Sequence, residues 1–226
     1  MANVIAVDGP SGAGKSSVSR IVGERLGYLH VDSGALYRIM TWQCLERGVD
    51  TGDEEAVAAF ARKLDVECRP ENGHVEYYVG GELPGDRIRK PEINAHASKV
   101  ATVKEVRERI TSLLRGMTGY GNLIIEGRDI TSAVFPDSPA RFYLTASAEA
   151  RARRRRKEEV EKGIANQSEE EVKASLLARD AIDSTRRHAP LVKADGVVEI
   201  DSSDMTLEEV VQAVLDALPD GWKRED

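Results

Sequence analysis

The chain opens with Val4-Ile-Ala-Val-Asp-Gly-Pro-Ser-Gly-Ala-Gly-Lys-Ser16, and this stretch decides the fold class. Its apolar first part predicts a strand, its last eight residues match the pattern G-x-x-x-x-G-K-[ST], and a helical pattern follows over 17–26. Glycines let successive backbone N–H groups turn inward around a phosphate, and the helix N-terminus adds partial positive charge. The stretch therefore predicts a nucleoside triphosphate site, in which Lys15 reaches the β- and γ-phosphates and the Ser16 hydroxyl binds Mg²⁺.

Length and composition describe one globular domain with an embellishment. The 226 residues are 41% hydrophobic and 31% charged, so the chain can bury a sizeable core. The net charge of −7 disfavours a general nucleic-acid binder, which is usually basic. Cys44 and Cys68 are too few for a disulfide framework and fit no metal-site spacing, so we expect both to be reduced and partly buried. Because no signal peptide or membrane-spanning stretch is visible, we expect a cytoplasmic protein that binds neither nucleic acid nor membrane.

Strand-like and helix-like segments alternate along the chain. Strands are predicted at 4–7, 28–31, 123–125, 141–144 and 197–200, and helices at 15–26, 35–47, 54–63, 103–116, 148–162, 169–182 and 207–218. Short strands separated by helices imply parallel crossovers. The sequence therefore predicts an α/β fold, a P-loop three-layer sandwich with a five-stranded parallel sheet and helices on both faces. Ligands of such sheets collect at the carboxyl ends of the strands.

One region breaks this alternation. Between 64 and 89, alternating segments are separated by Asn72-Gly73 and Gly80-Gly81, which are hairpin signals. We therefore expect a small antiparallel β insert that hangs off the core. In this division, 1–63 and 101–220 form the core, 64–100 form the insert and a return helix, and 221–226 form a frayed tail.

Polar side chains follow the second and third predicted strands. Asp32-Ser-Gly-Ala-Leu-Tyr-Arg38 comes after the second strand, and Glu126-Gly-Arg-Asp129 comes after the third. Asp32 and Ser33 would also make good helix N-caps, and the second group could form a structural ion pair. Carboxylates and guanidiniums at the end of a buried strand are nevertheless costly without a partner. We therefore interpret both groups as a site for phosphate, metal or sugar.

Two later helical segments are rich in arginine. Residues 151–157 carry six cations in seven positions, and Arg179, Asp183 and Arg186 share one helix face. The first segment fits three interpretations: an RNA-binding patch, a solvated face paired with the glutamates that follow, or a mobile lid, about 148–165, that brings guanidiniums onto transferring phosphates. The second segment presents more arginine than a salt-bridged helix needs.

The spread of arginines narrows the class of phosphate-loop protein. A GTPase would carry a guanine-reading Asn-Lys-x-Asp motif, and an ATPase motor would carry a strand ending in Asp-Glu; the sequence has neither. Arg38, Arg128, Arg155, Arg179 and Arg186 follow separate elements that could converge on one cleft. Two substrates with several phosphates need such neutralisation, so the pattern is typical of a small-molecule kinase.

Together these motifs resemble the bacterial cytidylate (CMP) kinase family, a branch of the nucleoside monophosphate kinases. The resemblance runs from Ile5 to about Leu191. The matching stretches are Asp8-Gly-Pro-Ser-Gly-Ala-Gly-Lys15, Asp32-Ser-Gly-Ala-Leu-Tyr-Arg38, Gly127-Arg-Asp-Ile130, Val134-Phe-Pro-Asp137, Glu161-Lys-Gly163, Arg179-Asp180 and Ala189-Pro-Leu191. The resemblance implies direct in-line transfer of the γ-phosphoryl group of ATP to CMP or dCMP with Mg²⁺, by a monomeric enzyme whose lid and insert close over the substrates.

The resemblance also implies a role for each matching residue. ATP is held by Gly9, Pro10, Ser11, Gly12, Ala13, Gly14, Lys15, Ser16 and Ser17, with Arg151 and Arg155 from the lid. CMP is held by Ser33, Tyr37, Arg38, Ser98, Arg107, Arg128, Asp129, Arg179, Asp183 and Arg186. The catalytic residues are Lys15, Arg38, Arg128, Arg155 and Arg179. Mg²⁺ is bound directly by Ser16 and through water by Glu126.

Within the CMP set, the implied division of labour follows the parts of the nucleotide. Ser33, Arg107 and Arg186 read cytosine, Ser98, Arg179 and Asp183 hold the pentose, and Arg38 and Arg128, with Asp129 nearby, clamp the phosphate. Two positions depart from the family pattern, which often has Asp at Glu126 and Gly at Thr131. The alternatives are another small-molecule kinase, of the UMP/CMP, thymidylate or shikimate type, and a nucleotide-gated RNA-binding protein that uses the arginines of 151–157.

Overall fold

The computed structural model of the chain describes residues 2–161, 163 and 167–222. Three expectations fall in part on other residues. Lys162 of the Glu161-Lys-Gly163 motif, residues 164–165 of the expected lid and residues 223–226 of the expected tail lie outside the described residues.

The described chain alternates strands and helices as expected. The strands are β1 (Val4–Asp8), β2 (Leu29–Asp32), β3 (Glu67–Glu71), β4 (His74–Tyr78), β5 (Leu123–Gly127), β6 (Ala140–Thr145) and β7 (Val198–Asp201). The helices are α1 (Lys15–Leu26), α2 (Ser33–Glu46), α3 (Glu54–Ala61), α4 (Pro91–Val100), α5 (Lys104–Gly116), α6 (Ala148–Glu161), α7 (Glu169–Thr185) and α8 (Leu207–Asp216). Short helical turns lie at η1 (Gly85–Arg89), η2 (Met117–Tyr120) and η3 (Ile130–Val134).

The strands form one sheet in the order β3-β4-β2-β5-β1-β6-β7. The strands β2, β5, β1, β6 and β7 are parallel, which confirms the five predicted parallel strands. The hairpin β3–β4 is antiparallel, as expected, but it does not hang off the core. Its strand β4 pairs with β2 through His74 and His30, so the hairpin belongs to the sheet. The sheet therefore has seven strands, and the prediction of a sheet of only five is wrong.

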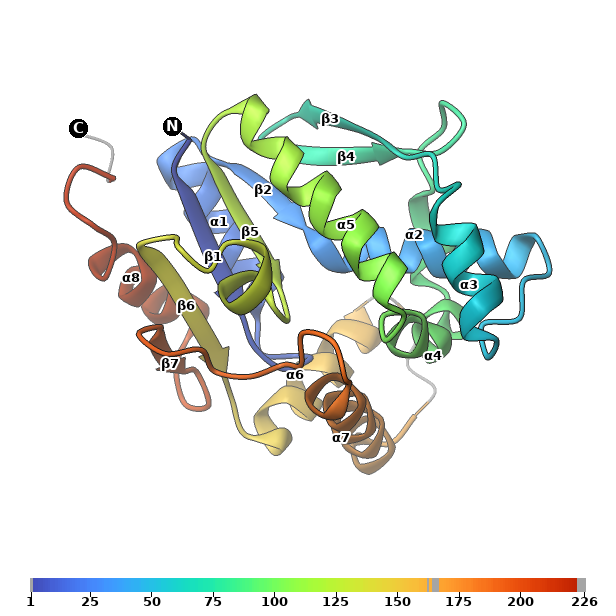
Figure 1. Ribbon diagram of the computed structural model, residues 1–226. Coiled ribbons are helices and arrows are strands. Elements are labelled where there is room, and N and C mark those ends of the chain that lie inside the picture. Colours follow the sequence, from blue (N-terminus) through green and yellow to red (C-terminus); the bar gives the residue numbers. More distant parts are fainter. Residues whose placement is uncertain (1, 162, 164–166, 223–226) are drawn as a thin grey trace.

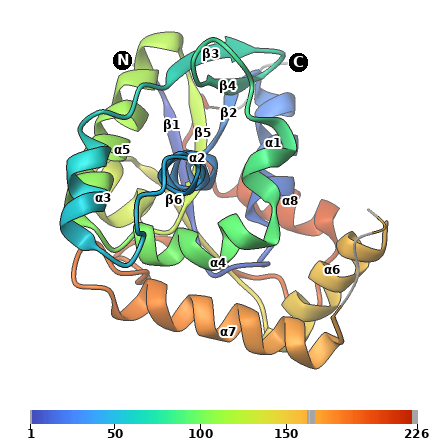
Figure 2. The ribbon, with the colours of Figure 1, turned by 90° about the vertical axis from the view of Figure 1, so that its right-hand side faces the viewer.

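Helices cover both faces of the sheet and complete the three layers (Figures 1 and 2). The helices α1 and α8 pack on one face, and α2 and α5 pack on the other with α3 and α4 beside them. The central strands β1 and β5 are buried over their whole lengths because both of their faces are covered. An apolar cluster lies on each side of the sheet, so the core consists of two layers.

The arginine-rich helices lie at the carboxyl edge of the sheet. In Figure 1, α6 and α7 lie beyond the arrowheads of the strands. The two helices pack against each other, and α7 also packs against α4. A capping box in which Ser168 and Glu171 satisfy each other's backbone N–H groups fixes the start of α7. The fold therefore brings the segments 151–157 and 179–186 to the edge where ligands bind.

The remaining expectations concern the cysteines, the tail and membranes. Cys44 and Cys68 are both free, as expected, and burial raises the pKa of each thiol to about 11. Trp222, inside the expected tail, packs its ring 6.5 Å from that of Tyr28, so this residue belongs with the core. Among the helices that the structure describes, none combines the length and the apolar character needed to cross a membrane.

Candidate active site

The phosphate loop joins β1 to α1 at the carboxyl edge. Gly9 and Gly14 have φ angles of 148° and 91°, which L side chains rarely adopt. Gly9 also lies directly against β6: a Cβ added at this residue would lie 1.9 Å from the carbonyl oxygen of Leu144. Lys15 is 5% exposed, and its Nζ donates to the carbonyl oxygens of Gly9 and Pro10 at 2.9 and 2.8 Å. The lysine side chain therefore folds back across its own loop.

Burial and, to a smaller extent, the charge of Arg128 lower the pKa of Lys15 to about 7. The unfolded chain keeps the ordinary pKa of 10.5, so between these values it binds more protons than the folded chain does and the free energy of unfolding rises with pH. Since the slope is at most about 1.4 kcal/mol per pH unit, we expect Lys15 to add about 1 to 2 kcal/mol of stability between pH 7 and pH 9. Urea unfolding of the ligand-free wild type and Lys15→Met at both pH values checks this. An equal pH response of the two proteins would contradict it.

Ser16 and Glu126 bring a hydroxyl and a carboxylate together beside the loop. The Oγ of Ser16 donates to Oε1 of Glu126, which is buried at the end of β5. The backbone carbonyl of Glu126 accepts the hydroxyl of Ser33 at 2.6 Å. Ser17 follows, exposed, in the first turn of α1. The structure thus places the two predicted metal-binding residues in contact.

Asp8, which the sequence analysis gave no role, ties the strand of the phosphate loop to the turn that carries Arg128. Its carboxylate accepts the backbone N–H groups of Ile130 and Thr131 at 2.9 and 2.7 Å and the hydroxyl of Thr131 at 2.7 Å. Burial raises the pKa of Asp8 to about 6, against the effect of these hydrogen bonds. Thr131, one of the two departures from the family pattern, therefore adds a side-chain hydrogen bond that glycine could not make.

Asp32 and Arg38 form an ion pair at the start of α2. One oxygen of Asp32 caps α2 by accepting the N–H of Ala35 at 3.1 Å, and the other accepts the guanidinium of Arg38 at 2.7 Å. The hydroxyl of Tyr77, from β4, donates to the carbonyl of Asp32 at 3.1 Å. Asp32 thus fills the capping role, and the inserted hairpin contacts the end of β2 beside Arg38.

Two carboxylates and three guanidiniums form one network next to it. Asp129 accepts hydrogen bonds from Arg107 and, at 3.4 Å, from Arg186. Asp183 accepts from the Nε of Arg128 at 3.1 Å and lies 3.7 Å from Arg186. Each of these side chains is at most 6% exposed, except Arg128 at 21%. The structure therefore joins five predicted CMP residues from α5, α7 and the turn after β5.

Tyr37 and Ser98 flank this network. The guanidinium of Arg107 lies over the Tyr37 ring, 5.4 Å from its centroid, and burial raises the pKa of the tyrosine. Ser98 is buried in α4, which packs against α2 and α7. Both residues therefore lie on elements that border the arginine network.

Arg179 is the most crowded cation of the site. Its Nε is buried with no hydrogen-bond partner among the described residues. Burial, followed by the charge of Arg128 and, more weakly, those of Arg38 and Arg155, lowers the pKa of Arg179 to about 10, against the opposing effect of Asp183. The other three predicted catalytic arginines therefore lie within electrostatic reach of Arg179. Carboxylates already pair with those three, whereas the buried Nε of Arg179 is costly unless an anion binds it.

Arg155 is partly exposed and pairs with residues of its own helix. Its guanidinium is 38% exposed and pairs with Glu158 and Glu159 of its own helix at 3.3 and 3.2 Å. These contacts match the solvated face that the sequence left open as an alternative for 151–157. Arg155 is nevertheless close enough to affect the pKa of Arg179, so the same side chain borders the cluster.

Arg151 and Asp180 form an ion pair beside the phosphate loop, and both residues contact Ser11. Arg151 is buried, donates to the carbonyl of Ser11 at 2.9 Å and pairs with Asp180 of α7. Asp180 also accepts the N–H of Ser11 at 3.0 Å. The guanidinium of Arg151 is therefore hydrogen-bonded to protein groups. The sequence analysis gave Asp180 no role. Its position beside Arg179 in the matching stretch was the only sequence feature that pointed to a place in the site.

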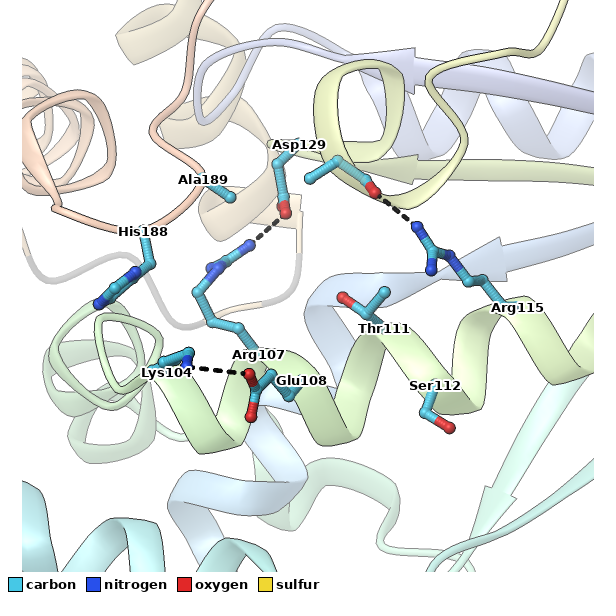
Figure 3. Close-up of a pocket in the computed structure, with 10 residues that line it drawn as sticks. Lys104, Arg107, Glu108, Thr111, Ser112, Arg115, Asp129, His188 and Ala189 are labelled. Carbon is cyan, nitrogen blue, oxygen red and sulfur yellow. Dashed lines mark hydrogen bonds and ion pairs between the residues drawn. The ribbon is translucent and has the colours of Figure 1, made fainter.

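A groove lies along α5 beside the pair formed by Arg107 and Asp129. Figure 3 shows Arg107 and Asp129 paired on one side of it, Lys104 and Arg115 of α5 along it, and His188 facing them. The groove holds about 490 Å³ and its lining includes no residue of the phosphate loop. It shares only Arg107 and Asp129 with the predicted site residues, so the hollow is not the ATP site.

Comparisons with known proteins agree with this geometry. The family model "Cytidylate kinase" matches residues 5–220. The cytidylate kinase of Clostridioides difficile (strain 630) is 41% identical over 212 residues, which cover 94% of this chain and 96% of that protein. The cytidylate kinase of Mycolicibacterium paratuberculosis (strain ATCC BAA-968 / K-10) is 43% identical over 216 residues, which cover 94% and 93%.

A solved structure supports the fold alone. The crystal structure of an uncharacterized protein from Eubacterium ventriosum ATCC 27560 aligns with a TM-score of 0.52 at 12% identity, over 96% of this chain and 97% of that one. The family match, by contrast, spans the phosphate loop, the Gly127-Arg-Asp129 turn and the arginines of α7. Since the model and both relatives cover nearly the whole chain, the protein belongs to the cytidylate kinase family.

Proposed function

We propose that this protein transfers the γ-phosphoryl group of ATP to the phosphate of CMP or dCMP, giving ADP and CDP or dCDP. As a member of the cytidylate kinase family it is an ATP-dependent enzyme that acts on these nucleotides. The observation that carries the proposal is the crowding of Arg38, Arg128, Arg155 and Arg179 at the carboxyl edge beside a phosphate loop. Bringing two polyanions together requires neutralisation of their repulsion, and this is the main task in phosphoryl transfer.

On the donor side, backbone N–H groups of 9–17 hold the phosphates of ATP. Lys15 leaves the carbonyl oxygens of Gly9 and Pro10 for the β- and γ-phosphates, whose charge raises its lowered pKa again. Arg151 and Arg155 of α6 add positive charge from the lid side. The ammonium thus becomes fully charged where the transferred group needs it.

On the acceptor side, Arg38 and Arg128 clamp the phosphate of CMP. Arg179 has an unpartnered Nε and lies in reach of both, so it suits the charge that develops between the two substrates. The acceptor phosphate is already anionic at pH 7, so it attacks directly and no covalent enzyme intermediate is needed. The arginines then serve to hold donor and acceptor in line.

Cytosine is selected by groups that complement its edge. The base presents acceptors at N3 and O2 and a donor at N4, which the guanidiniums of Arg107 and Arg186 and the hydroxyl of Ser33 can match. Uracil offers the opposite pattern at N3 and at its fourth ring position. The guanidiniums and Asp129 are already oriented by their mutual pairing, which supports this assignment.

The pentose is held by Ser98, Arg179 and Asp183. The carboxylate of Asp183 is 6% exposed and is oriented by Arg128, so it can accept a hydrogen bond from a 3′-hydroxyl. Both CMP and dCMP carry that hydroxyl. This arrangement supports the use of both nucleotides.

A magnesium ion fits the donor site. The hydroxyl of Ser16 and the carboxylate of Glu126 are hard oxygen ligands in direct contact, and Mg²⁺ is commonly held by one or two such groups together with substrate phosphates and water. Ser16 would bind the ion directly and Glu126 would bind one of its waters. When bound, the ion neutralises charge on the phosphates.

The remaining parts of the proposal concern motion and setting. We assign 64–100 as the part that closes over the monophosphate and about 148–165 as the lid, because Tyr77 of the hairpin already contacts Asp32 and Arg155 already borders the arginine cluster. We further propose a cytoplasmic monomer that binds neither nucleic acid nor membrane; the net charge of −7 supports the first exclusion.

A coupled ADP-release assay with ATP and Mg²⁺ tests the function, with CMP, dCMP, UMP, AMP and shikimate offered separately. We expect turnover with CMP and dCMP far above the other acceptors. Equal turnover with UMP would contradict the cytosine assignment, and turnover with shikimate would favour the other kinase class. No turnover with any acceptor, together with salt-dependent RNA binding, would favour the RNA-binding alternative.

A further inference from the structure

A carboxylate of α7 contacts the backbone of the phosphate loop. Asp180 is 15% exposed, and one of its oxygens accepts the backbone N–H of Ser11 at 3.0 Å while the other pairs with Arg151. Arg151 closes the arrangement by donating to the carbonyl of Ser11 at 2.9 Å. The two residues of the pair come from different helices, α6 and α7, and both contact Ser11 of the loop.

Both groups that Asp180 holds are ones that a nucleotide needs. Backbone N–H groups of the phosphate loop bind phosphate oxygens, and Arg151 is one of the lid cations proposed above for ATP. The carboxylate also raises the pKa of Lys15, so its charge is felt at the phosphate-binding lysine. The carboxylate of Asp180 is therefore an internal anion that accepts from two donors beside the phosphate loop, the N–H of Ser11 and the guanidinium of Arg151.

We propose that Asp180 is a positioning residue that holds Ser11 and Arg151 while the donor site is empty and releases them when ATP or ADP binds. The proposal rests on the proposed function, because it takes a nucleoside phosphate as the ligand of the loop. Two anions cannot share one N–H and one guanidinium at full strength, and the incoming phosphates carry more charge than the carboxylate. The nucleotide therefore displaces the aspartate.

The consequence reaches the acceptor through α7. The same helix carries Arg179 and Asp183, and Arg186 caps its end. Release of Asp180 loosens a contact that ties this helix to the phosphate loop, so donor binding changes the freedom of the residues proposed to hold CMP. Binding free energies are reciprocal, so CMP in turn changes the affinity for the donor.

Asp180→Asn is the decisive variant, because it keeps the shape of the side chain and removes the charge that competes with phosphate. Isothermal titration of the full chain with ADP and Mg²⁺ should show roughly threefold to tenfold tighter binding in the variant, the worth of one such hydrogen bond. The KM for ATP should fall in parallel. A residue that merely supported the loop would give weaker binding and a higher KM, and either that result or unchanged affinity would overturn the proposal.

Lys173→Ala is the matched control. Lys173 also lies on α7 and pairs with Glu149 of α6, but this exposed pair does not involve the phosphate loop. If losing an ion pair between α6 and α7 were enough to change the ADP affinity, both variants would show the same change. The proposal instead predicts unchanged ADP affinity in Lys173→Ala. Tighter binding in both variants would overturn it.

A second measurement uses only the wild type and so does not depend on the folding of a variant. Hydrogen–deuterium exchange in residues 176–185 should speed up when ADP is added without CMP, because the tie to the loop is released. Unchanged or slower exchange there would overturn the proposal. Failure of the proposed function looks different: the wild type would then bind no ADP or would not phosphorylate CMP, whereas failure of this inference leaves both intact.

Discussion

Replacing Arg179 with methionine is expected to lower kcat with CMP by about 10²- to 10³-fold and, at the same time, to raise the melting temperature of the ligand-free enzyme. The loss of rate follows from removing one preorganised charge from the transition state. The gain in stability follows because burial and the charges of Arg128, Arg38 and Arg155 lower the pKa of Arg179 to about 10, so the folded chain pays for keeping it charged. Removal of the guanidinium relieves this repulsion by about 1 kcal/mol.

Arg187→Met is the matched control for this experiment. Arg187 is exposed and follows Arg186 by one position, so its replacement removes the same charge and adds the same side chain outside the cluster. We expect nearly unchanged kcat and melting temperature in the control. Steady-state kinetics and thermal unfolding without nucleotide measure both quantities. A variant Arg179→Met that loses stability along with activity would show that the guanidinium acts as a structural contact and not as a charge held for a ligand.

The parts of the fold that the sequence predicted are those with a local signal. The strand-loop-helix unit ending at Lys15 and Ser16 could be read directly, because glycine spacing and apolar runs lie next to each other along the chain. The same holds for the hairpin, whose turn at Asn72-Gly73 is a two-residue signal. The place of that hairpin could not be predicted, because it is attached to β2 by contacts of His30 and Asp32 with His74 and Tyr77, and no local sequence signal marks these residues as partners.

In the site, too, the sequence indicated which residues are involved but not which residues they contact. The arginines could be predicted as a group, because they lie on separate helices and a turn that the fold brings to the carboxyl edge of the sheet. Their partners could not be predicted, since contacts such as Asp180 to Ser11 join residues 169 positions apart. Arg151 is the clearest case. Its position in a basic run suggested a free lid cation, but in the structure its guanidinium pairs with the carboxylate of Asp180.

Gly9→Ala is expected to prevent folding or to cost at least about 4 kcal/mol of stability. The added Cβ would lie 1.9 Å from the carbonyl oxygen of Leu144, a backbone atom in the middle of the sheet. The interior is close-packed, and β6 cannot move away without breaking its pairing with β1 and β7. The φ of 148° at Gly9 adds backbone strain for any L residue. Urea unfolding and the yield of soluble protein measure the effect.

Gly14→Ala separates the clash from the strain. Gly14 also has a positive φ, 91°, in the same loop, but an added Cβ there meets no atom within 4 Å. Only the conformational cost remains, about 1 to 2 kcal/mol, so this variant should fold and unfold cooperatively at a lower urea concentration. If Gly9→Ala proved no less stable than Gly14→Ala, the close approach of the loop to β6 would not be what requires glycine at the first position. If it is far less stable, Gly9 is needed because the loop enters the site through the narrow space beside β6, and this approach sets where the bound phosphates lie relative to the arginines of α7.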